Sequence, residues 1–265
     1  MKPTELIKRC RSGIAQIYLE NDRECIGSGS AFLVDGGLVT NSHNLRRITF
    51  DTLVIRFESD INNNYSNEIR LSSQHCIESI AAESPENEKD FVYIILSEPE
   101  CNGRHIFEFS DSSSLIVGEQ IVFMGYPFSS PHLTSHIGYV SSLHKSNGVE
   151  IIQIDGSVNS GNSGGPLIDL KTGKVAGIVT RAETGLLKEQ FNQLLQALKN
   201  NHEILKHQQS FAKISIAGID PIQAMKASQA SMEQIVTQLR RSANVGIGFA
   251  FSAKYVKEDI VHLKK

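Results

Sequence analysis

The stretch that decides the fold is Gly161-Asn162-Ser163-Gly164-Gly165-Pro166, a glycine-rich hexapeptide ahead of the apolar Leu167-Ile168. Glycine lacks a Cβ, so this loop can turn the backbone N–H groups of Gly161 and Ser163 toward one point. An oxygen that gains negative charge could sit there, beside the serine hydroxyl. A plain turn before a strand fits the same residues, so the rest of the chain must decide between the two interpretations.

A serine hydroxyl is a weak nucleophile at neutral pH and needs a nearby base, for which imidazole is the usual choice. The chain has nine histidines. His43 has the best setting, because it follows a hairpin signal at Asp35-Gly36-Gly37 and a short strand at 38–40. We therefore expect this imidazole at the end of a strand. A solvated loop histidine fits the same position.

The spacing of His132 and His136 is that of a metal-binding pair on one face of a helix. Pro131 and the β-branched residues around the pair argue against a helix, so the two rings would not converge on one ion. We expect no metal and no organic cofactor.

An acid that orients the imidazole must come from a rigid element. Asp90 fits this role, because it directly precedes the apolar run Phe91 to Leu96, which predicts a buried strand. An aspartate that caps a strand in solvent is the alternative.

In chain order, Thr40-Asn41-Ser42-His43, Asp90-Phe91-Val92 and the hexapeptide resemble the motifs of the chymotrypsin-like (trypsin-like) serine peptidases, in the HtrA-like branch. Further matches are Val117-Gly118-Glu119, Gly125-Tyr126-Pro127-Phe128, Gly138-Tyr139-Val140-Ser141, Gln153-Ile154-Asp155 and Gly246-Ile247-Gly248-Phe249-Ala250. The resemblance covers roughly residues 12–182 and 244–261. It implies a mainly β protein of two packed antiparallel β-barrels with the site between them.

Apolar or alternating runs predict two sets of strands. The first set is 13–19, 30–34, 37–40, 52–57 and 91–96, and the second is 120–124, 136–143, 150–154, 166–169 and 174–180. Cys101 to Val117 is the expected crossover. We assign residues 1–108 to an N-terminal barrel with His43 and Asp90, and residues 109–265 to a C-terminal barrel with Ser163.

The stretch of about 184–244 departs from the family and predicts a helical insertion in the second barrel. Apolar residues recur there at three- and four-residue spacing. They are Leu186, Leu187, Phe191, Leu194, Leu195 and Leu198, then Met225, Met232, Ile235, Val236 and Leu239 after a helix start at Asp220-Pro221. We expect an antiparallel helical hairpin that packs on the barrel or on itself, with a docking surface for a regulatory protein as the alternative.

A short amphipathic helix is expected over Ser252 to Leu263, close to the last residue of the sequence. We therefore expect no room for the PDZ domain that HtrA-like relatives usually carry. Peptide sensing by that route is not expected.

Composition excludes several classes of partner. The formal net charge is -3 and the pI is near 6.3, so nucleic acid is not expected. The sequence contains no run of 18 apolar residues, which is about the length needed to span a bilayer. Met1 to Cys10 carries charge where an export signal needs an apolar core, and the four cysteines show no paired metal spacing. We therefore expect a cytoplasmic protein with reduced, mostly buried thiols.

The resemblance implies acyl transfer in two halves. His43 takes the proton of Ser163 as the hydroxyl attacks a peptide carbonyl, Asp90 steadies the imidazolium, and the N–H groups of Gly161 and Ser163 form the oxyanion hole. Asn162 stands where digestive relatives have an aspartate that pairs with a newly cut N-terminus. An amide cannot form that ion pair, so we expect no proteolytic zymogen switch.

The substrate is expected to be a polypeptide. By resemblance, Ser157 lies at the base of the specificity pocket, which favours small or medium apolar side chains there. Thr180, Arg181 and Ala182 are expected along the edge that pairs with an extended substrate.

Three other functions stay open. The chain could be a catalytically silent protease fold that binds peptides or acts as a scaffold, although an intact triad argues against it. It could be a peptidase that stays silent until a partner docks on the insertion. An esterase is chemically conceivable, but an extended groove suits polypeptides better.

Overall fold

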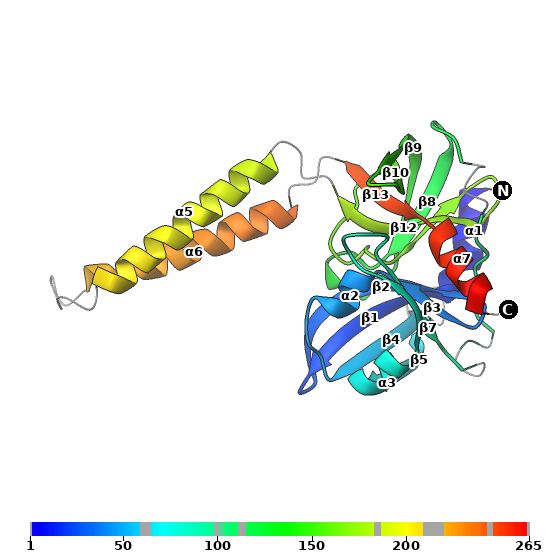
Figure 1. Cartoon of the computed structure of the whole chain (residues 1–265), viewed down its shortest axis with the longest axis horizontal. Helices are drawn as coiled ribbons and strands as arrows, with labels where there is room; N and C mark the ends of the chain where they lie inside the picture. The colour runs from blue at the N-terminus through cyan, green and yellow to red at the C-terminus, as the bar shows by residue number, and fades with distance from the viewer. Residues whose placement is uncertain are drawn as a thin grey trace. The chain divides into compact units, whose positions relative to one another are not determined.

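The computed structural model describes residues 2–58, 65–97, 101, 103–110, 115–182, 187–208, 220–242 and 246–263. The contacts divide the chain into two compact units, Met1–Ala182 with Gly246–Lys265, and Glu183–Val245. The first, the barrel unit, holds the strands, and the second, the helical hairpin, holds two long helices (Figure 1). The predicted insertion at about 184–244 corresponds to the second unit. The domain boundary at 108/109 stays a prediction.

A seven-stranded antiparallel sheet forms the first half of the barrel unit, in the order β5-β4-β1-β2-β3-β7-β6. Its strands are β1 (Ile14–Asn21), β2 (Glu24–Val34), β3 (Gly37–Thr40), β4 (Thr52–Glu58), β5 (Tyr65–Ser72), β6 (Ile80–Ser84) and β7 (Phe91–Ile95). The long β1 and β2 pair in register from Ile14 opposite Phe32. The pairing leaves β5 and β6 as edges, so this sheet is a half-barrel.

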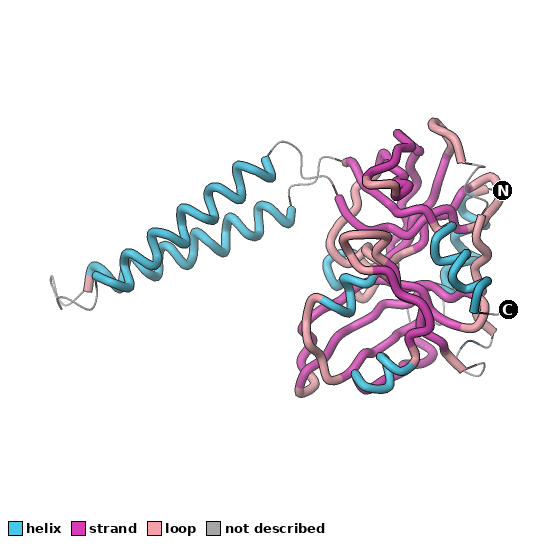
Figure 2. Tube along the Cα trace, in the orientation of Figure 1, coloured by secondary structure: helices cyan, strands magenta, loops and turns pink. Residues whose placement is uncertain are grey.

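A closed antiparallel barrel forms the second half, in the order β10-β13-β12-β11-β8-β9. Its strands are β8 (Gln120–Gly125), β9 (Thr134–Ser146), β10 (Val149–Asp155), β11 (Pro166–Asp169), β12 (Val175–Ala182) and β13 (Ile247–Ser252). The predicted class, a mainly β protein of the trypsin-like double-barrel type, is confirmed. Figure 2 shows strands as the main component of this unit.

Among the described residues, four short α-helices lie around the strands of the barrel unit: α1 (Pro3–Cys10), α2 (Ser42–Arg46), α3 (Ser73–Glu78) and α7 (Lys254–Leu263). The last agrees with the short C-terminal helix expected over Ser252 to Leu263. Helix α1 buries Leu6 and Cys10 completely. The charged N-terminal segment is therefore an amphipathic helix of the folded unit.

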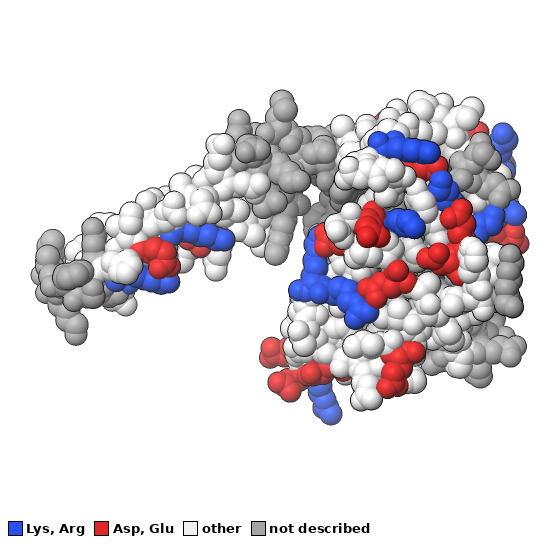
Figure 3. Space-filling model, viewed as in Figure 1, with Lys and Arg blue, Asp and Glu red and all other residues white. Residues whose placement is uncertain are grey.

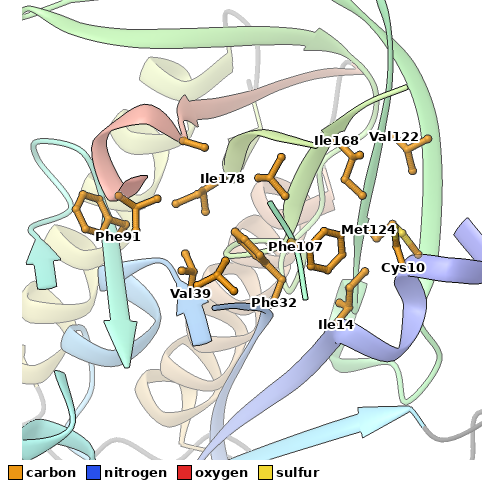
Figure 4. Packing of buried hydrophobic residues seen from close by; sticks show 14 of the residues in the cluster. Cys10, Ile14, Phe32, Val39, Phe91, Phe107, Val122, Met124, Ile168 and Ile178 are labelled. Carbon is orange, nitrogen blue, oxygen red and sulfur yellow. The ribbon is translucent and has the colours of Figure 1, made fainter. Parts of the chain in front are cut away.

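The main apolar core joins the two sheets. Figure 4 shows Ile14, Phe32 and Val39 of the first sheet packed toward Met124 and Ile178 of the second barrel. One further cluster fills the interior of each half. Because strand side chains alternate between faces, each sheet contributes residues both to its own interior and to the shared core. The joint between the two halves is thus well packed.

The helical hairpin consists of α5 (Leu187–Gln208) and α6 (Pro221–Ser242), which run antiparallel against each other. Asp220 caps α6, since its Oδ1 accepts the backbone N–H groups of Ile222 at 2.9 Å and Gln223 at 3.2 Å. The predicted start of this helix is therefore correct. Leu186 of the predicted apolar stripe lies outside the described residues, as do the side chains of Leu187 and Phe191.

The strand that contains His136 also agrees with the sequence. His136 lies on β9 and stacks on the ring of Phe123 at a centroid distance of 4.7 Å. Burial lowers the pKa of this imidazole. Among the described residues, no group of three or more His, Cys, Asp or Glu could hold a metal ion.

All four cysteines are free. Cys10 and Cys76 are buried, Cys101 is half-buried and Cys25 is exposed, so the expected burial holds for two of them fully. Burial raises the pKa of the Cys76 thiol to about 11. Within the described ranges, no helix has the length and hydropathy needed to cross a membrane. Figure 3 shows positive and negative side chains interspersed on the visible face of the barrel unit.

Candidate active site

His43 lies on the short helix α2, which follows β3 after a single residue, Asn41. The sequence predicts it at a strand end, and the structure adds a helical turn that is anchored to β6. Glu83 of β6 accepts hydrogen bonds from Ser42 Oγ at 3.0 Å and from Arg46 Nε at 2.8 Å. The Arg46 hydrogen bonds hold the pKa of Glu83 below its ordinary value. Because this ion pair is partly exposed, it contributes at most about 1 kcal/mol and serves mainly to orient α2.

The structure brings His43 and Asp90 into direct contact. Nδ1 of His43 lies 2.7 Å from Oδ2 of Asp90, and the His43 backbone N–H donates to Oδ1 at 3.1 Å. The Asp90 side chain is 1% exposed and that of His43 is 11% exposed. Asp90 itself has a positive φ of 50°, and Asn41 Nδ2 donates to its carbonyl oxygen at 2.7 Å. A residue in this uncommon conformation persists only where its surroundings fix it.

Thr180 of β12 completes the surroundings of Asp90. Its Oγ1 donates to Asp90 Oδ2 at 2.7 Å, and the Thr180 side chain is buried. Burial alone would raise the pKa of Asp90, but the hydrogen bonds from His43 and Thr180 outweigh it and the pKa is lowered. The carboxylate is therefore held ionised against the imidazole.

Ser163 lies in the loop between β10 and β11. Its Oγ donates to the backbone carbonyl oxygen of Thr180 at 2.8 Å. Among the described hydrogen bonds, this hydroxyl has no bond to His43. Thr180 thus contacts both Asp90, through its hydroxyl, and Ser163, through its carbonyl.

Ser30 of β2 and Asn44 of α2 hold the backbone of the Ser163 loop. The Ser163 carbonyl oxygen accepts from the Ser30 backbone N–H at 2.9 Å and from Asn44 Nδ2 at 3.0 Å. Ser30 Oγ donates to the Gly161 carbonyl at 2.6 Å and accepts the Tyr126 N–H at 2.9 Å. Ser30 is completely buried. The loop of one barrel is therefore fixed by the other.

The geometry around Gly161 leaves donors available. Phe128 N–H donates to the Ser160 carbonyl at 2.6 Å, which turns that carbonyl toward Phe128. Among the hydrogen bonds of the described residues, none uses the N–H of Gly161 or Ser163. Gly161 has φ 98°, and a Cβ there would lie 2.2 Å from the Tyr126 carbonyl oxygen. Only glycine fits this position.

Asn162 is completely buried, and neither its side-chain oxygen nor its nitrogen has a hydrogen-bond partner among the described residues. A buried amide in this state costs free energy. The absence of a proteolytic zymogen switch stays a prediction.

The predicted substrate-binding residues differ in burial. Thr180 is buried and directed at Asp90, while Ser157 is exposed and follows β10. Arg181 and Ala182 end β12 and pair with β13, and their side chains lie outside the described residues.

The fold defines a class of protein, the trypsin-like double-barrel fold. Residues 27–178 match the family model of the trypsin-like peptidase domain, and the chain belongs to this family. Within the family, its similarities are to HtrA-type proteases.

Curated relatives support that branch, and a solved structure supports the fold. The chain is 32% identical over 161 residues to the "Probable periplasmic serine endoprotease DegP-like" of Bartonella henselae, covering 58% of this chain and 28% of the relative. It is 31% identical over 164 residues to "Protease Do-like 1, chloroplastic" of Arabidopsis thaliana, covering 58% and 33%. The structure of "HtrA-type protease AlgW with tripeptide" superposes with a TM-score of 0.60 at 18% identity, covering 97% and 62%. The chain thus spans a third or less of the length of these two curated relatives.

The expected cytoplasmic location is wrong, because these relatives are periplasmic or chloroplastic by name. The physical reason lies in the N-terminal segment. Its charges belong to α1, a helix of the folded unit. Their presence does not report on the compartment.

Sequence reasoning missed Ser30 and Asn44, which hold the Ser163 loop. It also missed that Thr180 contacts Asp90. A signal existed for Asn44, which directly follows the His43 motif. Ser30 and Thr180 act across 131 and 90 residues of chain, respectively. No local pattern marks contacts at that separation.

Proposed function

We propose that this chain is a serine endopeptidase in which His43, Asp90 and Ser163 form a catalytic triad. The observation that carries the proposal is the 2.7 Å contact between His43 Nδ1 and Asp90 Oδ2 on elements that also hold the Ser163 backbone. With Nδ1 facing the carboxylate, Nε2 is the nitrogen that remains to act as the base. An ionised, buried Asp90 fixes that tautomer and stabilises the imidazolium.

The proposed reaction begins with a rotation of the Ser163 side chain from the Thr180 carbonyl toward His43 Nε2. Such a rotamer change is a small motion between staggered states. Oγ then attacks the substrate carbonyl while Nε2 takes its proton, and the N–H groups of Gly161 and Ser163 stabilise the oxyanion. His43 returns the proton to the leaving amine. Water repeats the sequence on the acyl-enzyme.

The proposed substrate is an extended polypeptide that pairs with β12 at Thr180 to Ala182, with its specificity side chain near Ser157. In support, the pairing of β11 with β12 ends at Ile178, which leaves later β12 backbone beyond that ladder. Profiling with a peptide library tests this assignment. Cleavage after small or medium apolar residues is expected, and strong cleavage after Lys or Arg would contradict it.

Labelling with a fluorophosphonate tests the nucleophile. The wild-type chain is expected to react at one serine, and Ser163→Ala is expected to lose labelling and about 10⁶-fold in kcat. Ser141→Ala, an exposed serine on β9, is the matched control and should label like wild type. Equal labelling of Ser163→Ala would overturn the assignment.

The alternative is a catalytically silent protease fold that binds peptides or acts as a scaffold. The hydrogen bond from Ser163 Oγ to the Thr180 carbonyl favours it, because the hydroxyl is not directed at the base. The two functions differ in one result. Failure of a folded chain to label, both alone and in lysate, supports the scaffold.

A peptidase gated by a regulatory protein is the intermediate case. In that proposal, docking on the helical insertion would favour the Ser163 rotamer that faces His43. Labelling in lysate but not with the isolated chain would support this form of regulation.

A further inference from the structure

The helical hairpin leaves many of its large apolar side chains exposed. On α5, the less exposed positions that face α6 are Leu195, Leu198, His202 and Leu205. On α6, the less exposed positions are Pro221, Ile222, Lys226, Gln229, Glu233, Val236 and Thr237. Four of these seven α6 residues are polar. The contact between the two helices therefore leaves much of their apolar surface unused.

The apolar side chains of α6 lie on an exposed stripe. Met225, Met232, Ile235 and Leu239 are spaced by seven, three and four residues, and each is between 53% and 57% exposed. On α5, Leu194 is 46% and Ile204 is 55% exposed. Seven- and three- or four-residue spacing places such residues on one face of a helix.

The two stripes lie on the same side of the hairpin. Leu194 and Ile204 directly precede the inward-facing Leu195 and Leu205, and Met232 directly precedes the inward-facing Glu233. One residue corresponds to a rotation of about 100° about the helix axis. In an antiparallel pair the second helix runs in the opposite direction, which reverses both the sense of rotation along the chain and the direction toward the neighbouring helix. The position before each inward-facing residue therefore lies on the same side of the hairpin in both helices. We call this the apolar face, formed by Leu194, Ala197, Ile204, Met225, Met232, Ile235 and Leu239.

Charges lie on the opposite side. Lys199, Glu203 and Lys206 of α5 directly follow inward-facing residues, and Lys206 pairs with Glu203 at 2.8 Å. The polar residues interspersed on the apolar face are uncharged, namely Asn201 and Ser228. A basic margin, which helices that bind anionic membranes carry, is missing from the described side chains of this face. The chemistry fits an apolar, uncharged partner surface.

We propose that the apolar face pairs with the same face of a second copy of this chain, so that two hairpins form a four-helix bundle about a two-fold axis. Each 22-residue helix is about 33 Å long, and two adjacent helices are about 20 Å wide. Face-to-face pairing therefore buries about 1,200 Å² in total, the size at which specific interfaces begin. Identical uncharged faces also meet without like-charge repulsion.

Sedimentation velocity of the full chain tests the proposal over a wide concentration range. Wild type is expected to approach twice the chain mass of 29.2 kDa. Met232→Glu places a charge at the centre of the apolar face and should shift the dimer toward monomer at least tenfold in Kd. Gln234→Glu adds the same charge to the same helix on the opposite side and should stay dimeric.

Two further measurements keep the result unambiguous. Far-UV circular dichroism at high concentration shows whether Met232→Glu retains its helices, and the milder Met232→Gln repeats the test if it does not. High salt should leave the wild-type dimer intact, because no charges form the contact. A wild-type monomer at all concentrations, or an assembly of equal mass in both Glu variants, overturns the proposal. The readout is mass, so it is independent of peptidase activity.

Discussion

The barrel unit and the helical hairpin differ in how completely they bury their apolar residues. Three apolar clusters fill the barrel unit, and one of them joins its two sheets. Across the described side chains of the hairpin, only Leu198, Gln229 and Val236 are buried, and one of these is polar. A unit with a closed core is stable alone, whereas a two-helix unit with an exposed stripe gains stability from a partner. The site belongs to the first kind of unit and the proposed interface to the second.

Among these substitutions, replacing Asp90 should have the largest effect, and it should change the chemistry of the barrel unit without changing the hairpin. In the proposed triad, Asp90→Asn removes the carboxylate that orients His43, so kcat should fall about 10⁴-fold. Steady-state peptidase kinetics measure this, and sedimentation of the same variant should show an unchanged mass. A variant that loses less than tenfold in kcat would remove Asp90 from the triad.

Amide hydrogen exchange addresses the difference in burial directly. At low protein concentration, amides of α5 and α6 should exchange about 10³-fold faster than those of β8 and β11, because local opening of the hairpin costs less. Mass spectrometry of peptic fragments measures both regions in one sample. Raising the concentration should slow exchange in the hairpin alone. Equal protection of both units at low concentration would remove the contrast.

Substitution of a glycine in the loop that contains Ser163 should have the next largest effect. A Cβ on Gly164 would lie 2.1 Å from the Ser30 carbonyl oxygen, and its φ of 88° is already unfavourable for alanine. Gly164→Ala should destabilise the barrel unit by more than about 3 kcal/mol. Gly148 has φ 81° but no atom within 4 Å, so Gly148→Ala should cost only about 1 kcal/mol. Chemical denaturation compares the cost of the clash in Gly164→Ala with the cost of backbone strain alone in Gly148→Ala. Similar losses of unfolding free energy in the two variants would contradict a clash at Gly164.

Loss of the Ser30 hydroxyl should have a smaller effect. Ser30→Ala leaves the Gly161 carbonyl and the Tyr126 N–H without a buried partner, which should cost about 1 to 3 kcal/mol and lower kcat. Ser28→Ala, on the same strand with its exposed contact to Ser129 at 2.6 Å, should stay within about 0.5 kcal/mol of wild type. Denaturation and kinetics together measure both variants. An unchanged kcat in Ser30→Ala would show that the hydroxyl does not shape the loop.

The smallest effect concerns acid stability. The pKa of Asp90 is lowered from its ordinary value of 3.8 in the folded state. A lowered pKa stabilises the fold at pH above the unfolded-state value, and this contribution is lost as pH falls through the folded-state value. Between pH 5 and 2, the unfolding free energy of wild type should therefore fall more steeply than that of Asp90→Asn. Parallel pH profiles would contradict the assignment.

The positions of most strands and motifs could be predicted, because each rests on a local pattern. Phe91 to Leu96 is a continuous apolar run, and Asp220-Pro221 is a helix start that needs no tertiary context. The predicted strands do not include β5, β6 or β13 (Ile247–Ser252). Of these, Tyr65–Ser72 and Ile80–Ser84 lie at the sheet edges and mix polar with apolar residues. Edge strands face solvent more and so carry a weaker periodic signal.

The candidate site was predictable in its residue types but not in its connections. His43 and Asp90 stand beside recognisable strands, and the structure places them in contact. The hydroxyl rotamer of Ser163 and the double role of Thr180 depend on how β12 meets the loop before β11. The bond from Thr180 to Asp90 arises only when the two barrels pack, and the bond from Ser163 to Thr180 depends on the tertiary fold of the second barrel. No local sequence pattern predicts either contact.

Because Ser30 forms hydrogen bonds to the loop of Gly161 and Ser163, the conformation of that loop depends on the packing of the two barrels. If the gene were divided between β7 and β8, neither fragment alone would supply both halves of this attachment. Reassembly of the two fragments would restore the loop and, with it, any reactivity of its serine. The two fragments could therefore serve as a split reporter, in which any reactivity of Ser163 requires that both fragments associate.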